Sequence, residues 1–227
     1  MGLITNWLII LIPSLAIFLY TGGLYTKWTR FVSPVFPVFP LAASYFISRI
    51  KSRYWQRLLV AVAILPGVFF LRFYLTPDIR IQATDWINAN IPTSAYILSE
   101  AGNVVNLPLY GHHSVTHFDF YNLDTEPKSV DKLITAIADS QYIIIPSRRI
   151  FKNQTAPRFP VSQKYYDALF SSQLGFQLLT AFSPNTDILL HPENAEETWT
   201  VFDRPTIRVY RKTSQKTIEE YIHLLAP

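Results

Sequence analysis

Two basic residues early in the chain have the types and spacing to hold a phosphate group. Lys27 and Arg30 lie three positions apart, so a helix would place both side chains on one face. A planar guanidinium matches two phosphate oxygens, and an ammonium adds a point charge. The simpler interpretation is interfacial anchoring, because basic residues commonly flank membrane helices.

A histidine-rich segment is the part of the sequence whose composition best suits a metal ion. It contains His112, His113, His117 and Asp119. A helix would bring His113 and His117 onto one face, whereas a strand would do so for His117 and Asp119, and both cannot hold at once. The spacing matches no established zinc pattern. We expect a loop with exposed histidines, keep His113, His117 and Asp119 as weak metal candidates, and leave metal dependence open.

Two more arginines and three acids could form further polar sites. Arg148 and Arg149 follow an apolar strand-like run, and ligands usually bind at the carboxyl ends of strands in open α/β sheets. These arginines could contact an anion there, although solvated loop arginines are common. Glu196, Glu197 and Asp203 are close in sequence, but nothing fixes the separation that a glycosidase carboxylate pair requires. We interpret these acids as structural and assign no catalytic residue.

The elements that must position these residues fall into two contrasting halves. No Asp or Glu occurs before Asp78, and residues 1–77 contain seven Lys or Arg. Three apolar runs occupy this first half, over about 3–25, 31–48 and 58–75. About 20 apolar residues suffice to cross a hydrocarbon core of ~30 Å. The sequence therefore predicts about three transmembrane helices in residues 1–77.

The loop charges predict how these helices are oriented. The most basic connection, 49–57, carries Arg49, Lys51, Arg53 and Arg57. Short basic loops face the cytoplasm, so the second half should lie outside a multi-pass plasma (inner) membrane. The lack of cysteine fits an extracytoplasmic domain without disulfides. Cations that punctuate apolar runs do not form the basic face of a nucleic-acid-binding domain, so we expect a lipid bilayer and no nucleic acid as partner.

Residues 78–227 alternate between helical and strand-like patterns. The helical patterns cover 79–90, 130–139, 163–172 and 215–225, and the strand patterns cover 95–99, 141–146, 176–182 and 206–211. Such alternation predicts an α/β sandwich with a mainly parallel sheet. We expect Gly175 to cap the helix at 163–172. No Gly-x-Gly-x-x-Gly or Walker loop is present, which disfavours a nucleotide-binding fold.

Two segments carry a resemblance to a known enzyme family. Lys27 to Pro37 reads Lys-Trp-Thr-Arg-Phe-Val-Ser-Pro-Val-Phe-Pro, and Glu196 to Pro205 reads Glu-Glu-Thr-Trp-Thr-Val-Phe-Asp-Arg-Pro. They resemble the last portion of polyprenyl-phosphate-sugar-dependent glycosyltransferases of the GT-C superfamily, in the protein O-mannosyltransferase-like branch. Arg204 departs from that pattern, in which His is more usual.

The resemblance implies transfer of a sugar from a polyprenyl-phosphate donor to a glycan, lipid or protein acceptor on the outer face of the membrane. Lys27 and Arg30 would then hold the lipid phosphate, and no protein-bound cofactor is implied. The family's general base is an acid in the first outer loop, which this chain lacks before Asp78. We therefore expect the C-terminal part of a transferase, or a split-gene product, inactive alone. The alternative is a non-catalytic membrane-anchored module that binds a partner or a glycan.

Overall fold

The computed structural model describes residues 2–24, 29–100, 106–109, 113–184 and 192–225, and it divides into two compact units. Unit 1 is Met1–Leu75 and unit 2 is Thr76–Pro227. The division lies two residues before the boundary predicted between positions 77 and 78.

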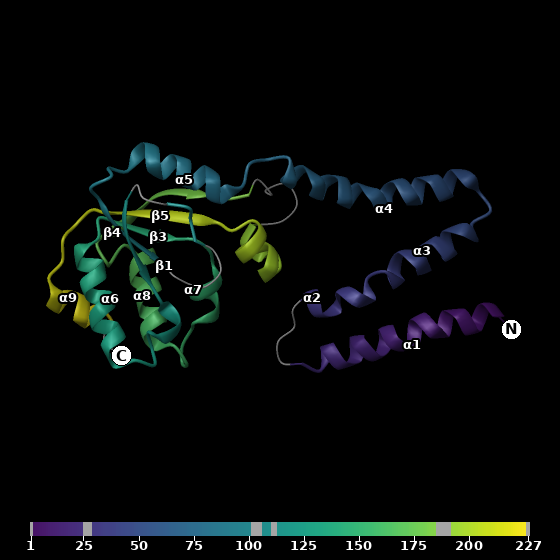
Figure 1. Ribbon diagram of the computed structural model, residues 1–227, viewed down its shortest axis with the longest axis horizontal. Helices are drawn as coiled ribbons and strands as arrows, with labels where there is room; N and C mark the ends of the chain where they lie inside the picture. Colours follow the sequence, from purple (N-terminus) through teal and green to yellow (C-terminus); the bar gives the residue numbers. More distant parts are fainter. Residues whose placement is uncertain (1, 25–28, 101–105, 110–112, 185–191, 226–227) are drawn as a thin grey trace. The chain divides into compact units, whose positions relative to one another are not determined.

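Unit 1 consists of helices (Figure 1). They are α1 (Gly2–Gly22), α2 (Thr29–Val32), the short 3-10 turn η1 (Ser33–Val35), α3 (Val38–Ser48) and α4 (Arg53–Tyr74). The helix predicted over about 31–48 is interrupted in the structure, where the backbone divides into α2, η1 and α3. The physical reason is the prolines at positions 34 and 37, which lack the amide hydrogen that a continuous helix needs.

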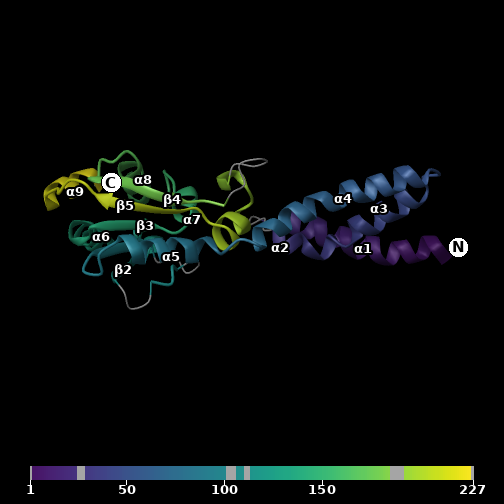
Figure 2. The same ribbon diagram turned by 90° about the horizontal axis from the view of Figure 1, so that it is seen from above.

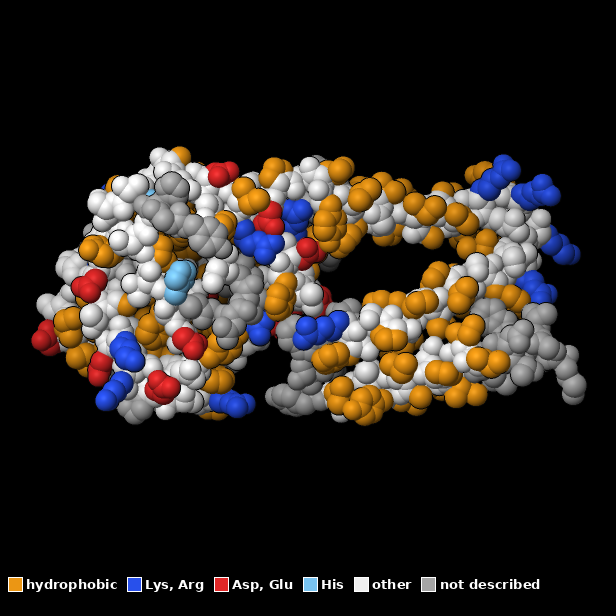
Figure 3. All heavy atoms as spheres, in the orientation of Figure 1, with side chains coloured by type: hydrophobic (Ala, Val, Ile, Leu, Met, Phe, Trp, Pro, Cys, Tyr) orange, Lys and Arg blue, Asp and Glu red, His pale blue; other side chains and the backbone are white. Residues whose placement is uncertain are grey.

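The helices of unit 1 are strongly apolar, but they differ in length. Among the described residues, one helical stretch, Arg53–Leu71, is long and apolar enough to cross a membrane. Ile9–Gly22 and Val38–Ser48 are apolar and shorter. Figure 3 shows apolar side chains along these helices and a group of Lys and Arg side chains at the turn between α3 and α4. Length and composition thus support one of the three predicted spans, the one in α4.

Unit 2 contains a five-stranded mixed sheet with the order β2-β1-β3-β5-β4. Its strands are β1 (Tyr96–Glu100), β2 (Ser114–Phe118), β3 (Tyr142–Ile145), β4 (Phe176–Phe182) and β5 (Ile207–Lys212). β1 pairs in parallel with β2 and β3, whereas β5 is antiparallel to both β3 and β4. The predicted α/β class is confirmed. The expected mainly parallel pairing holds for β2-β1-β3 and fails at β5, which enters the sheet without a helical crossover after β4.

Helices cover both faces of this sheet (Figures 1 and 2). α5 (Ile79–Asn90) packs on one face, and α6 (Pro127–Asp139), α8 (Pro160–Phe170) and α9 (Ile218–Leu225) lie on the other. Each face of the sheet has its own hydrophobic core, and successive strand residues point into opposite cores. Leu98 and Ile143 belong to the core beneath α6 and α8, while Ile97 and Ile144 belong to the core beneath α5. Short helical turns complete the unit: η2 (Phe120–Asn122), α7 (Arg149–Asn153), η3 (Pro192–Asn194) and η4 (Thr198–Asp203).

The turn after α8 differs from the expected glycine cap. The helix ends at Phe170, and Ser172 adopts the left-handed conformation with φ 63°. The Leu174 amide then donates to the Ala168 carbonyl at 3.1 Å, which closes the helix end. Gly175, with φ 79°, makes a second left-handed turn directly before β4. The expectation that Gly175 caps the helix is therefore wrong, because Ser172 performs that role.

Candidate functional site

The carboxyl edge of the parallel strands gathers a group of buried and half-buried polar residues. Glu100 is the last residue of β1, and Arg208 pairs with Ile145, the last residue of β3. Both side chains lie at this edge because β5 runs antiparallel to β3. We use the name edge cluster for the set Glu100, Arg148, Tyr166, Glu193 and Arg208.

Glu100 is a buried carboxyl group at the centre of the edge cluster. Its side chain is 3% exposed, and its Oε1 accepts a hydrogen bond from the hydroxyl of Tyr166. Burial raises the pKa of Glu100 to about 8, although the Tyr166 hydrogen bond and the charge of Arg208 act in the opposite direction. Burial also raises the pKa of Tyr166 well above its ordinary value. At neutral pH the pair is therefore an uncharged acid beside an uncharged phenol.

Arg208 is the cation that faces this acid. It forms an ion pair with Glu193, and its guanidinium carbon lies 5.5 Å from the centre of the Phe151 ring. Within the described residues, its Nη1 atom and the hydroxyl of Tyr165 are buried without a hydrogen-bond partner. The edge cluster thus contains a neutral acid, an ion pair and one unsatisfied donor on Arg208, and a second unsatisfied donor belongs to Tyr165, the neighbour of Tyr166 in α8.

Arg148 and Arg149 hold the segment that contains Glu193. Arg148 donates to Thr200 Oγ1 at 2.7 Å, to the Ala195 carbonyl at 2.8 Å and to the Glu193 carbonyl. The Arg149 guanidinium carbon lies 5.4 Å from the centre of the Phe202 ring. These contacts give both arginines a positioning role at the predicted edge of the sheet. Their contact with an external anion remains a prediction.

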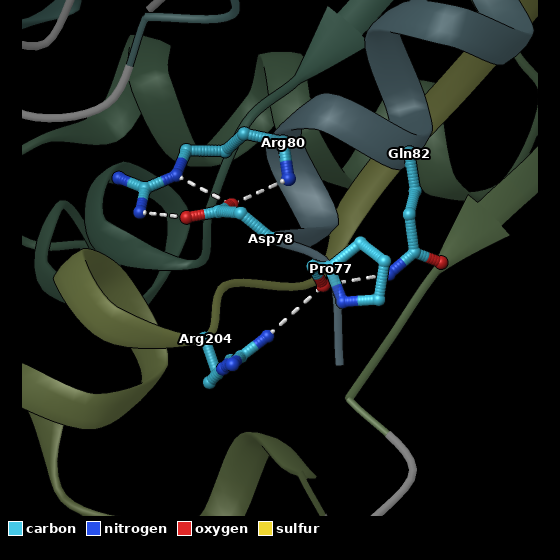
Figure 4. Close-up of polar contacts among 5 residues, drawn as sticks. All are labelled: Pro77, Asp78, Arg80, Gln82 and Arg204. Carbon is cyan, nitrogen blue, oxygen red and sulfur yellow. Dashed lines mark hydrogen bonds and ion pairs between the residues drawn. The ribbon is translucent and has the colours of Figure 1, made fainter. Parts of the chain in front are cut away.

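A second group of polar contacts surrounds the first residues of unit 2 (Figure 4). We call it the linker clamp, and it consists of Pro77, Asp78, Arg80, Gln82 and Arg204. Asp78 caps α5 by accepting from the Arg80 amide at 2.8 Å, and it also pairs with the Arg80 guanidinium. The Pro77 carbonyl accepts from Gln82 Nε2 at 2.9 Å and from Arg204 Nη1 at 3.2 Å. Arg204 thereby joins the loop before β5 to the residues before α5.

Charge complementarity stabilises the linker clamp. The hydrogen bond from the Arg80 side chain is the largest influence that lowers the pKa of Asp78, and the charge of Arg204 lowers it further. Arg204 is 7% exposed, so its charge lies in a largely buried environment. The Pro77 carbonyl and the charge of Asp78 offset part of the cost of burying it.

The segment between the two groups includes an unusual helical turn. η4, Thr198–Asp203, is a π-helix, a rare conformation that occurs frequently at functional sites. The edge cluster holds the segment on its N-terminal side, and Arg204 of the linker clamp fixes it directly after η4. The arrangement can therefore present the 198–203 backbone in one fixed position.

The histidine-rich segment does not assemble as a metal site in the described residues. His117 lies on the exposed edge strand β2, and His113 Nε2 is 3.2 Å from Asn88 Oδ1. Asp119 instead accepts from the Tyr121 amide at 2.9 Å and caps η2. The expected loop is wrong over 114–118, because this stretch pairs with β1 as a strand. No group of three or more His, Asp or Glu side chains that could hold a metal ion occurs in the part of the chain that the structure describes.

The phosphate-binding candidates have different outcomes. Lys27 lies outside the described residues, as does His112 of the histidine-rich segment. Arg30 belongs to α2 and is exposed, with its guanidinium carbon 5.5 Å from the centre of the Phe31 ring. The shared helical face predicted for Lys27 and Arg30 therefore remains a prediction.

Glu100, Tyr166 and Arg208 are not among the site residues predicted from the sequence. Glu100 could have been noticed as a carboxylate that directly follows a run of β-type residues, since the end of such a strand lies at the ligand-binding edge. The pairing of Glu100 with Tyr166 joins residues 66 positions apart and has no local signal.

Comparisons of the chain with protein-family models, curated proteins and solved structures gave no match.

Proposed function

We propose that this chain is the C-terminal part of an integral membrane glycosyltransferase that moves a sugar from a polyprenyl-phosphate donor to an acceptor on the outer face of the membrane. The linker clamp is the observation that carries the proposal. Through it, the segment that resembles the transferases is bonded by Arg204 to Pro77, two residues beyond the end of unit 1.

The apolar surface of unit 1 supports a membrane location. The candidate span Arg53–Leu71 has none of its side chains buried inside the protein. Leu65, Phe69 and Leu71 are each at least half exposed. Exposure of such a continuous apolar surface to water is unfavourable in free energy, whereas contact with lipid chains is favourable. The absence of acids before Asp78 agrees with this environment.

In the proposed reaction, the bond between the sugar anomeric carbon and the donor phosphate oxygen breaks, and a bond from that carbon to the acceptor oxygen forms. The polyprenyl phosphate leaves with the electron pair, and Lys27 and Arg30 stabilise its negative charge. A carboxylate takes the acceptor proton. Because no acid precedes Asp78, the proposal assigns this base to a part of the enzyme outside these 227 residues.

Binding of undecaprenyl phosphate tests the proposal without requiring the missing base. The chain in nanodiscs of neutral lipid should retain undecaprenyl phosphate in native mass spectrometry. Arg30→Ala should weaken this retention at least about tenfold. Arg49→Ala is the matched control, because Arg49 is an exposed cation in the turn after α3, and it should change retention by less than about twofold. Equal losses in the two variants would reduce the role of Arg30 to general attraction, and no retention by the unchanged chain would refute the proposal.

The alternative is a non-catalytic membrane-anchored module. The sequence observation in its favour is the missing acid in residues 1–77. A chain that binds a protein or glycan through unit 2 but fails to retain undecaprenyl phosphate would identify this second function.

A further inference from the structure

At the end of the sheet opposite the edge cluster, an exposed aromatic ring lies between two hollows. Tyr96 is the first residue of β1 and its side chain is 55% exposed. Cavities of about 540 Å³ and about 780 Å³ are both lined by Tyr96 and Gln141. Each volume falls within the range of roughly 300–1,000 Å³ that is usual for small-molecule sites.

The backbone beneath this ring is held rigidly. The Tyr96 amide donates to Gln141 Oε1 at 2.7 Å, and the Gln141 amide donates to the Tyr96 carbonyl at 2.9 Å. Gln141 Nε2 in turn donates to the Asp139 carbonyl at 3.1 Å. A ring on such a fixed backbone loses little conformational entropy when a ligand packs against it.

Polar side chains with unused hydrogen-bonding capacity surround the ring. Ser94 and Arg211 line one hollow, and Thr116 and Asp131 line the other. Within the described residues, these four side chains form no hydrogen bond or ion pair. Together they offer hydroxyl and guanidinium donors as well as hydroxyl and carboxylate acceptors.

The charges around the two hollows are mixed in sign. Asp131 and Asp139 face the same region as Lys132, Arg211 and Lys212. Lys212 is already engaged, because its Nζ donates to the carbonyls of residues 137 and 138 at 3.0 Å and 2.7 Å. A strongly anionic ligand such as a phosphate would meet carboxylates here, so a neutral ligand rich in hydroxyl groups fits better.

We propose that the two hollows around Tyr96 form a binding subsite for a neutral oligosaccharide. The C–H face of a pyranose ring is weakly positive and packs on the negative face of an aromatic ring. Its hydroxyl groups both donate and accept, which the surrounding side chains match. The two adjacent hollows accommodate sugar units on either side of the ring. This subsite stands independently of the transferase proposal, since it requires no lipid phosphate.

Saturation-transfer difference NMR on the full chain in nanodiscs tests the subsite with maltohexaose, cellohexaose, chitohexaose and mannohexaose as probes. At least one probe should receive saturation from the protein. Tyr96→Ala should weaken its binding at least about tenfold, and Tyr96→Phe should preserve it within about threefold because the aromatic ring remains. Leu178→Ala is the control, since Leu178 is 53% exposed on the other edge strand, β4, and should leave binding unchanged.

Each result of the NMR experiment either supports or overturns the oligosaccharide subsite. Binding lost in Tyr96→Ala and kept in Tyr96→Phe supports the subsite, provided that both variants unfold at the temperature of the unchanged chain. No saturation of any of the four probes overturns it. Binding unaffected by Tyr96→Ala, or transfer to a hexa-alanine peptide in place of the sugars, overturns it equally. Oligosaccharide binding without undecaprenyl phosphate retention would keep the subsite and refute the transferase, so the two failures are distinguishable.

Discussion

The carboxyl group of Glu100 links the stability of unit 2 to pH. Its folded pKa of about 8 lies above the ordinary value of 4.5, because burial disfavours the charged form. Below the ordinary value the group is protonated in both states. As pH rises toward about 8, only the unfolded chain releases the proton, so the free energy of unfolding falls by up to about 1.4 kcal/mol per pH unit. Above the folded pKa this loss levels off.

Glu100→Gln should remove this dependence while preserving the acceptor for Tyr166. Between about pH 5 and about pH 8, the unchanged chain should lose about 2 to 4 kcal/mol more unfolding free energy than the variant. Urea unfolding of the detergent-solubilised chain, followed by near-ultraviolet circular dichroism, measures the difference. Glu219→Gln, at an exposed position in α9, is the matched control and should follow the unchanged chain. Parallel pH profiles for Glu100→Gln and the unchanged chain would contradict the buried-acid interpretation.

Arg204 shows how one residue can connect distant parts of a chain. Its guanidinium donates to the Pro77 carbonyl, 127 positions earlier in the sequence. An imidazole has fewer donors and a shorter reach than a guanidinium, so this contact depends on arginine.

At the scale of elements, the turn between α8 and β4 depends on glycine. Gly175 has φ 79°, and a Cβ added there would lie 2.5 Å from the Ser214 carbonyl oxygen and 2.8 Å from its hydroxyl. Gly175→Ala should destabilise unit 2 by about 1 to 3 kcal/mol, since it combines left-handed strain with a backbone clash. Urea unfolding monitored by near-ultraviolet circular dichroism provides the measurement.

Gly67→Ala is the control for this substitution. Gly67 lies inside α4, and an added Cβ would meet nothing within 4 Å. The unfolding of unit 2 should therefore be unaffected by Gly67→Ala. An equally stable Gly175→Ala variant would show that the Ser214 loop moves aside without loss.

Elements of unit 2 whose structure follows from the local sequence pattern could be predicted. Elements whose structure depends on pairing with distant strands could not. The helix over 79–90 is predicted with its observed bounds because Ile91-Pro92 ends it, and the structure adds Asp78 as its N-terminal cap. β2 was missed, since an exposed edge strand with alternating polar residues has little apolar signal. The direction of β5 depends on its insertion between β3 and β4, which no local pattern encodes. The edge cluster was missed for the same reason.

At the scale of the whole molecule, the chain joins two units of opposite chemistry. Unit 1 exposes apolar side chains and has few buried ones, with Val35 its one buried hydrophobic residue among those described. Unit 2 has two apolar cores and all the acids of the chain. The membrane location that we propose would give the exposed apolar side chains of unit 1 an apolar environment.

The proposed orientation predicts which residues are accessible from outside the cell. The chain has no cysteine, so single substitutions give unique labelling sites. Gln177→Cys, at an exposed position in unit 2, should react with a membrane-impermeant maleimide in intact cells. Ser52→Cys, in the basic turn before α4, should react only after the membrane is permeabilised, because the positive-inside rule keeps this turn in the cytoplasm. The reverse pattern would place unit 2 in the cytoplasm and remove the outer-face reaction, whereas labelling of both sites in intact cells would mean that α4 does not span the membrane.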